Sequence, residues 1–258
     1  MRPAASHRDG LQESFAPPVQ RLLDAAGGVE GPFPSHDGDA SAEPGSSALM
    51  DKIYRRQRHI YDASRKFYLL GRDELISSLC PPEGGRVLEI ACGTGRNLVK
   101  LARTYPLAAC YGFDISAEML HTAQRSIERA DLVRRIRLAQ GDATNFDPQT
   151  LFGQPCFDRI IISYALSMIP PWREALRHAA GYLAPGGSLH LVDFGDQAGL
   201  PSAFRNALNR WLAAFHVTPR LTLEAEIAGV AGELGLSSRS TRRYRGYAVH
   251  GALERPRA

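Results

Sequence analysis

The residues that are most informative about a possible reaction lie in a glycine-containing turn. Gly93 and Gly95 follow the apolar segment 87–90 and precede a segment with helical periodicity. Glycines at such a junction let a ligand approach the main chain, and the start of a helix favours a polar or anionic group. A dinucleotide-binding turn has a third glycine where this chain has Leu98, so the spacing disfavours hydride transfer.

Two carboxylates follow later strand-like segments. Asp114 comes directly after residues 108–113, where a carboxylate can accept hydrogen bonds from both hydroxyls of a ribose. Asp142 follows residues 135–139 and lies in a Gly-Asp-Ala turn. Each has a purely structural alternative, because Asp114 or its neighbour Ser116 can cap the next helix and Asp142 can serve as a turn residue.

A regular alternation of segments must position these residues. Short apolar runs occupy residues 86–91, 108–113, 135–139, 157–163 and 188–194. Helical patterns occupy residues 97–104, 117–129 and 172–183, and after Pro201 residues 203–217 and 223–234. Two final strands are expected within 237–253, around Gly246. This alternation predicts an α/β fold with a mostly parallel sheet covered by helices.

The N-terminal region divides into two parts. Residues 1–49 are rich in Pro, Gly, Ser and Ala, show no periodicity and carry a net charge of −4, so they are predicted to be a disordered tail. Met50 is an alternative start of the protein. The pattern of residues 50–80 predicts two helices that precede the sheet as a lid. The first has apolar side chains at Ile53, Ile60 and Phe67, and the second, beyond Gly71, has them at Leu75, Ile76 and Leu79.

Composition excludes several classes of protein. The longest uncharged apolar run, residues 160–172, is broken by serines and prolines, so no membrane-spanning helix is predicted. The four cysteines are scattered without a CxxC pair, which indicates a reducing compartment and neither a disulfide framework nor a metal site. The isoelectric point near 9.0 leaves an RNA-binding module as an alternative. No RNA-binding fold motif accompanies the arginines, so no nucleic-acid partner is expected.

The glycine turn resembles motif I of the class I S-adenosylmethionine methyltransferases. Asp114, Asp142 and the turn 183–189 follow it in the order of that family, and the resemblance covers residues 87–194. The chain departs from the family form at Ala91, where the family has glycine. The resemblance implies a Rossmann-like three-layer sandwich with a seven-stranded, mostly parallel sheet and an antiparallel final strand. The cofactor core is expected at 86–194, with C-terminal helices and strands at 201–258.

The same resemblance implies S-adenosylmethionine as the cofactor and assigns residues to it. They are Glu89, Ala91, Gly93 and Gly95 for the methionine part, Asp114 for the ribose, Ile115 and Asp142 for the adenine, and Ala143 and Ser163 as further members.

Segments outside this core carry a second, narrower resemblance. Residues 54–75, 163–172 (SYALSMIPPW), 192–196 and 215–220 are similar to the N-methyltransferases that make betaine lipids. That family trimethylates the amine of diacylglycerylhomoserine, and this lipid is therefore the expected acceptor. Phosphatidylethanolamine is the next alternative, and a quinone ring carbon is a more distant one.

Five residues are candidates for the acceptor site. Tyr61 and Tyr164 offer aromatic faces to an ammonium that becomes quaternary, although either can equally pack in the core. Arg65 and Arg220 are candidates to pair with the homoserine carboxylate, or are surface cations. His216 is a candidate to take the amine proton, or caps a helix end.

A basic stretch indicates where in the cell the protein acts. Residues 52–66 carry six cations and a single acid beside apolar side chains, and residues 50–258 carry a net charge of +8. This composition favours an interfacial helix on an anionic membrane. A lid with a solvated basic face is the alternative, and the two are compatible. The expected localisation is cytoplasmic, peripherally bound to the inner face of the membrane.

Overall fold

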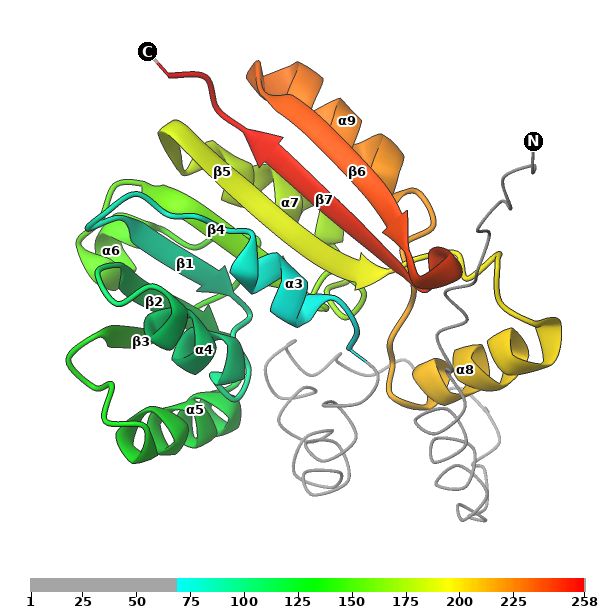
Figure 1. Cartoon of the computed structure of the whole chain (residues 1–258), viewed down its shortest axis with the longest axis horizontal. Coiled ribbons are helices and arrows are strands. Elements are labelled where there is room, and N and C mark those ends of the chain that lie inside the picture. Colours follow the sequence, from blue (N-terminus) through cyan, green and yellow to red (C-terminus); the bar gives the residue numbers. More distant parts are fainter. Residues whose placement is uncertain (1–68, 258) are drawn as a thin grey trace, which may run out of the picture. The chain divides into compact units, whose positions relative to one another are not determined.

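The computed structural model describes residues 69–257 (Figure 1). The predicted tail 1–49 and most of the predicted lid, residues 50–68, lie outside the described residues. The first described helix is α3 (Arg72–Ser77), which begins after Gly71. Leu75, Ile76 and Leu79 are buried, which confirms the predicted apolar face at the end of the lid segment.

A seven-stranded sheet forms the centre of the described residues, in the order β3-β2-β1-β4-β5-β7-β6. The strands are β1 (Arg86–Ile90), β2 (Ala109–Asp114), β3 (Ile136–Gln140), β4 (Phe157–Ser163), β5 (Leu183–Phe194), β6 (Ser237–Arg243) and β7 (Ala248–Glu254). Every neighbouring pair from β3 to β5 is parallel, whereas β7 is antiparallel to both β5 and β6. The predicted seven-stranded, mostly parallel sheet with an antiparallel final strand is confirmed.

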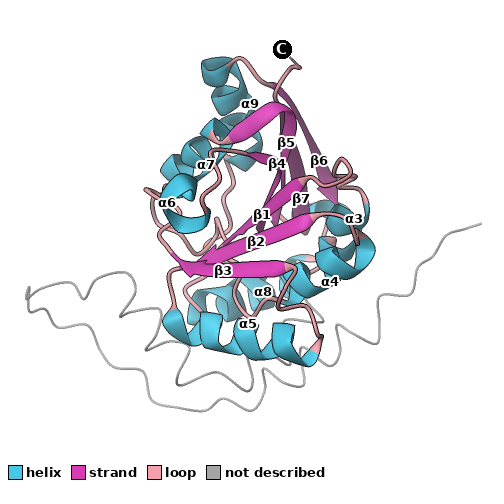
Figure 2. Cartoon of the chain, turned by 90° about the vertical axis from the view of Figure 1, so that its left-hand side faces the viewer, coloured by secondary structure: helices cyan, strands magenta, loops and turns pink. Residues whose placement is uncertain are grey.

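Helices cover both faces of this sheet, which gives three layers (Figure 2). One face carries α3, α4 (Arg96–Thr104) and α5 (Ala117–Arg129), and the other carries α6 (Pro148–Phe152), α7 (Trp172–Gly181) and α9 (Leu223–Leu234). A further helix, α8 (Ser202–Ala214), follows β5. The described helices include none that combines the length and the apolar character needed to cross a bilayer.

Helical periodicity explains how α7 packs on the sheet. Its buried residues are Trp172, Ala175, Leu176, Ala179 and Ala180, which recur at the spacing of one helix face. They meet the apolar side of β4 and β5, where Ile160, Ile162 and Leu189 are also buried. The small alanines let the helix approach the strands closely.

The main differences from the expected elements are in β5, α6 and α8. Strand β5 begins at Leu183 rather than 188, because its first residue pairs with Phe157 before an irregularity in the register. Helix α6 was not expected; it is a single short turn that Asp147 caps by accepting from the amides of Gln149 and Thr150. Helix α8 ends at Ala214, before His216 adopts a left-handed conformation with a φ of 56°.

Glycines at two kinds of position predict opposite effects on stability. A Cβ at Gly195 would overlap the carbonyl oxygen of Gly246, and Gly229 and Gly232 on α9 have no atom within 4 Å of such a Cβ. Gly195→Ala should therefore lower the free energy of unfolding by about 1–3 kcal/mol, because main chain has to move. Gly229→Ala or Gly232→Ala should raise it by about 0.5–1 kcal/mol, because alanine favours helix. Urea unfolding measures both; equal effects at the two positions would contradict the packing described.

Candidate functional site

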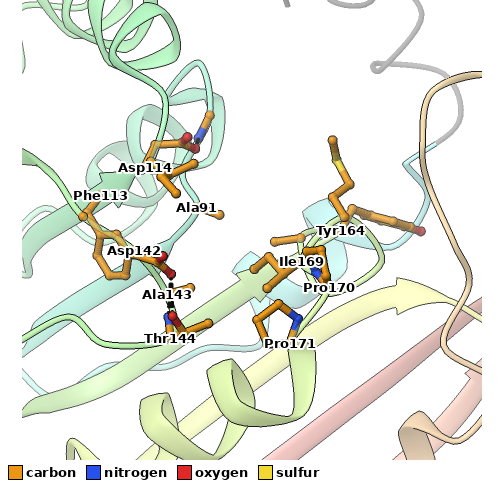
Figure 3. Close-up of a pocket in the computed structure, with 15 residues that line it drawn as sticks. Ala91, Phe113, Asp114, Asp142, Ala143, Thr144, Tyr164, Ile169, Pro170 and Pro171 are labelled. Atoms are coloured by element: carbon orange, nitrogen blue, oxygen red, sulfur yellow. Dashed lines mark hydrogen bonds between the residues drawn. The ribbon is translucent and has the colours of Figure 1, made fainter. Parts of the chain in front are cut away.

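The strand order of the sheet reverses between β1 and β4, and a cavity of about 210 Å³ lies there, at the carboxyl ends of the strands. Open α/β sheets bind ligands at this point. Figure 3 shows that the cavity has two walls: Asp114 and Asp142 lie on one side, and Tyr164, Ile169 and Pro170 lie on the other. The first wall carries carboxylates, whereas the second is mainly apolar.

The glycine turn joins β1 to α4 through left-handed residues. Ala91, Gly93 and Gly95 have φ values of 52°, 55° and 73°. A left-handed conformation strains any residue with a Cβ by about 1–2 kcal/mol, which explains why glycine suits the position of Ala91. Gly95 lines neither this cavity nor a second one on the other side of the turn. It instead lets α4 pack against Ala123 of α5, where a Cβ would lie 3.0 Å from the alanine Cβ.

Asp114 links the end of β2 to the glycine turn. It is 7% exposed, its Oδ2 accepts from the amide of Gly93 at 2.8 Å, and its Oδ1 accepts from the amide of Ser116 at 3.0 Å. Ser116 is the residue that caps α5, through a hydrogen bond from the amide of Met119 to its side chain. The carboxylate thus faces the cavity and fixes the turn at the same time.

Asp142 forms the turn after β3 and also faces the cavity. Its Oδ1 accepts from the amide and the hydroxyl of Thr144, at 2.9 and 2.8 Å (Figure 3). Its Oδ2 makes no hydrogen bond within residues 69–257, so that oxygen is available to a ligand. Ile115 and Ala143 line the same cavity and supply apolar surface beside the two carboxylates.

A second cavity of about 200 Å³ lies on the other side of the glycine turn, and both cavities are lined by Ala91 and Gly93. Glu89 is 2% exposed, and its Oε1 accepts from Nδ2 of Asn97 at 2.7 Å. The Oγ of Ser163 is buried and has no hydrogen-bond partner in the part of the chain that the structure describes. An elongated polar ligand therefore fits across the turn, with one end in each cavity.

Sequence reasoning missed the two buried polar residues Arg72 and Asn97 of this second cavity. Asn97 lies in the first turn of α4, where its side chain donates to Glu89. Its position two residues after Gly95 was a signal in the sequence that it belongs to the glycine turn. Arg72 is 8% exposed and its Nε donates to the carbonyl of Leu69. No sequence signal separates Arg72 from the many other basic residues nearby, because only the fold brings α3 to this cavity.

The structure brings Tyr164 to the apolar wall, in a buried environment. It is 2% exposed, its hydroxyl donates to the carbonyl of Leu70 at 2.7 Å, and its ring meets that of Phe194 edge-on at 4.7 Å. Burial raises the pKa of this phenol well above its usual value, so it stays neutral. Its predicted contact with an ammonium remains a prediction.

Two of the other acceptor candidates, Arg220 and His216, line neither of the described cavities. Arg220 lines neither cavity, and its guanidinium donates to carbonyls of the loop after β4. His216 is exposed beyond the end of α8 and also lines neither. Tyr61 and Arg65 lie outside the described residues. The predicted roles of these four residues remain untested.

Charged groups near the C-terminus are largely paired with one another. The arginines of β6 form ion pairs, Arg239 with Glu254, Arg242 with Asp196 and Glu224, and Arg243 with Glu74. Acids therefore compensate the charge of these three arginines. Within residues 69–257, no group of three or more His, Cys, Asp or Glu side chains is arranged to hold a metal ion.

Comparison with known proteins identifies the centre of the chain. Residues 87–187 match the family described as methyltransferase domain. Demethylmenaquinone methyltransferase of Listeria welshimeri is 27% identical over 150 residues, which cover 56% of this chain. The protein of the same name from Clavibacter sepedonicus is 28% identical over 162 residues, or 60% of this chain. The match spans 61% of the length of each of these relatives.

Solved structures agree with this assignment at the level of the fold. An O-methyltransferase family protein from Burkholderia thailandensis has a TM-score of 0.64 and 19% identity, covering 93% of this chain and 69% of that one. The plantazolicin methyltransferase BpumL, solved in complex with a triazolic desmethylPZN analog and SAH, has a TM-score of 0.62 and 16% identity, covering 82% of this chain and 96% of that one. The core is thus a methyltransferase domain with the class I fold, which favours the enzyme over the RNA-binding alternative.

Proposed function

We propose that this chain is an S-adenosylmethionine-dependent methyltransferase that methylates the amine of diacylglycerylhomoserine. The observation that carries the enzyme class is the pair of cavities joined at Ala91 and Gly93, within a methyltransferase domain. The residues there fit the cofactor, because carboxylates suit a ribose and an adenine amino group and a buried serine hydroxyl lacks a partner. The cofactor supplies an electrophilic methyl group on a sulfonium.

We assign the parts of the cofactor site as follows. Asp114 and Asp142 hold the ribose and adenine in the first cavity, with Ile115 against the adenine ring. In the second cavity, Glu89 and Ser163 bind the amino-acid end, and Arg72 complements its carboxylate. The left-handed turn at Gly93 keeps the main chain close to the ligand between the two ends.

The protein's contribution to the reaction is chiefly to position the partners. Transfer to an amine is an in-line displacement, so its rate depends on holding the nitrogen in line with the sulfonium and on keeping the nitrogen unprotonated. The wall formed by Tyr164, Ile169 and Pro170 presents mainly apolar surface, which keeps water away from the reacting atoms. The proton released from the amine passes to solvent or to a base not yet identified.

Resemblance in four segments supports the lipid acceptor, and 163–172, one of the four, forms the apolar wall. The basic stretch 52–66, which lies outside the described residues, supports action at an anionic membrane surface. We propose peripheral binding to the cytoplasmic face, where a lipid head group is within reach of the first cavity.

A quinone ring carbon is the second candidate acceptor. The observation that favours it is the name of the relatives, demethylmenaquinone methyltransferase. An apolar wall suits a quinone ring as well as it suits a lipid. Both candidates share an apolar body that carries the methyl acceptor.

Lipid mass spectrometry in a host without betaine lipids separates these acceptors. With the full chain and a supply of diacylglycerylhomoserine, we expect the trimethylated betaine lipid to accumulate, and the Asp142→Ala variant should produce much less of it. Phosphatidylethanolamine should remain unmethylated, since it has no amino-acid carboxylate. Methylated quinone without betaine lipid would instead favour the second candidate.

A further inference from the structure

We propose that Arg220 is a positioning residue that holds the apolar wall of the first cavity in place. The wall is the loop 164–171, and Arg220 lies in the segment 215–222 that connects α8 to α9. The inference rests on the proposed function only in treating this loop as the acceptor side of the cavity. It differs from the predicted role of Arg220 as the partner of a substrate carboxylate.

The guanidinium of Arg220 donates hydrogen bonds to several main-chain carbonyls of one loop. Its Nε donates to the carbonyl of Leu166 at 2.9 Å, and its Nη2 donates to that of Ile169 at 2.8 Å, with the carbonyl of Ser167 at 3.5 Å. The planar fork of arginine can serve carbonyls three residues apart at once, whereas the single ammonium of lysine cannot reproduce that geometry. The wall is therefore held by two of the arginine's own donors.

Two further contacts hold the same loop. The amide of Thr218 donates to the carbonyl of Ser167 at 2.9 Å, and the amide of Ser167 donates to Oδ2 of Asp193 at 3.1 Å. Asp193 lies at the end of β5 and is 1% exposed. Burial raises the pKa of this carboxyl to about 6, and the nearby charge of Arg220 opposes the rise. Ser167 is thus fixed from the sheet on one side and from segment 215–222 on the other.

The held loop contributes directly to the cavity. Ile169, whose carbonyl accepts from Arg220, lines the cavity together with Met168 and the two prolines that follow. Met168 and Phe215 also pack against Met119 of α5. The loop that Arg220 holds therefore also packs, through Met168, near the start of α5 and beside Phe215, the residue after α8. Loss of the guanidinium should loosen the wall without altering Asp114 or Asp142 across the cavity.

The test compares Arg220→Ala and Arg220→Lys with a matched control, Arg173→Ala. Arg173 also links neighbouring elements, through Glu226 and the hydroxyl of Thr222, but it does not touch the loop. Hydrogen–deuterium exchange is measured on the full chain with SAH bound. We expect the amides of residues 165–169 to exchange at least tenfold faster in Arg220→Ala, with Arg220→Lys in between and Arg173→Ala unchanged.

Three additional readouts separate positioning from loss of fold. SAH affinity, by calorimetry, should stay within about twofold of the unmodified chain. Added guanidinium ion, below denaturing concentrations, should slow exchange in Arg220→Ala but not in Arg220→Lys, whose ammonium occupies the site. In transfer assays with diacylglycerylhomoserine vesicles, KM for the lipid should rise and kcat should fall in Arg220→Ala. Unchanged exchange at 165–169, or equal acceleration in Arg173→Ala, would overturn the proposal whether or not this lipid is the acceptor.

Discussion

Asp114→Ala is expected to weaken binding of S-adenosylmethionine at least tenfold while leaving the protein folded. The carboxylate is assigned to the ribose hydroxyls, and hydrogen bonds to a charged group contribute about 1.5–3 kcal/mol each. The same carboxylate accepts from the amide of Gly93 at 2.8 Å, so its loss also releases the glycine turn. Both effects lower affinity, and isothermal titration calorimetry with SAH measures the sum.

Two control variants make this result specific. Asp147→Ala also removes a carboxylate that accepts from main-chain amides, but at the start of α6, away from both cavities. It should cost about 1 kcal/mol of stability through the lost helix cap and leave SAH affinity unchanged. Asp114→Asn keeps the size of the side chain but places an amide against a donor, so it should also bind weakly. Unaltered affinity in Asp114→Ala would contradict the assignment of the cofactor site.

Reversing three arginines of the basic stretch is expected to abolish most binding to anionic vesicles. Arg55, Arg56 and Arg58 are three of the six cations in the segment 52–66, which lies outside the described residues. Each cation near an anionic leaflet contributes about 1 kcal/mol of attraction, and each reversal to glutamate also adds repulsion. Vesicle sedimentation should show a steep loss of binding that raised salt reproduces in the unmodified chain.

A triple reversal elsewhere controls for net charge. Arg125, Arg129 and Arg134 are exposed on and after α5, and their change to glutamate alters the total charge equally. This control should keep most vesicle binding, and both triple variants should keep the cofactor affinity of the unmodified chain. Equal losses in the two variants would show that overall charge, and not the predicted interfacial segment, attracts the membrane.

The sequence predicted the fold well because its signals are local. The buried face of α7 repeats at helical spacing from Trp172, and the glycine turn follows an apolar strand, so both elements are visible within a few residues. The start of β5 was missed because Leu183 pairs with Phe157 across the sheet, which no local pattern announces. The cap of α6 by Asp147 was present in the sequence, but the helix is too short to show periodicity.

The candidate site was predictable in part for the same reason. Asp114 and Asp142 follow strands that end at one edge of a parallel sheet, so their order along the chain implies that they converge. Arg72 lines the second cavity, and Arg220 holds the loop of the apolar wall without lining either cavity. Their geometry depends on tertiary packing, because Arg220 meets carbonyls more than 50 residues away and carbonyls carry no signature in the sequence.

The most direct measurement of the proposed activity offers the full chain mixed anionic vesicles that contain both diacylglycerylhomoserine and phosphatidylethanolamine, with S-adenosylmethionine labelled on its methyl group. Lipids are then separated and the label in each is counted. We predict label in the homoserine lipid and its methylated products, and none above background with Asp114→Ala. Label that accumulates in phosphatidylcholine and its partly methylated precursors, with none in the homoserine lipid, would contradict this account.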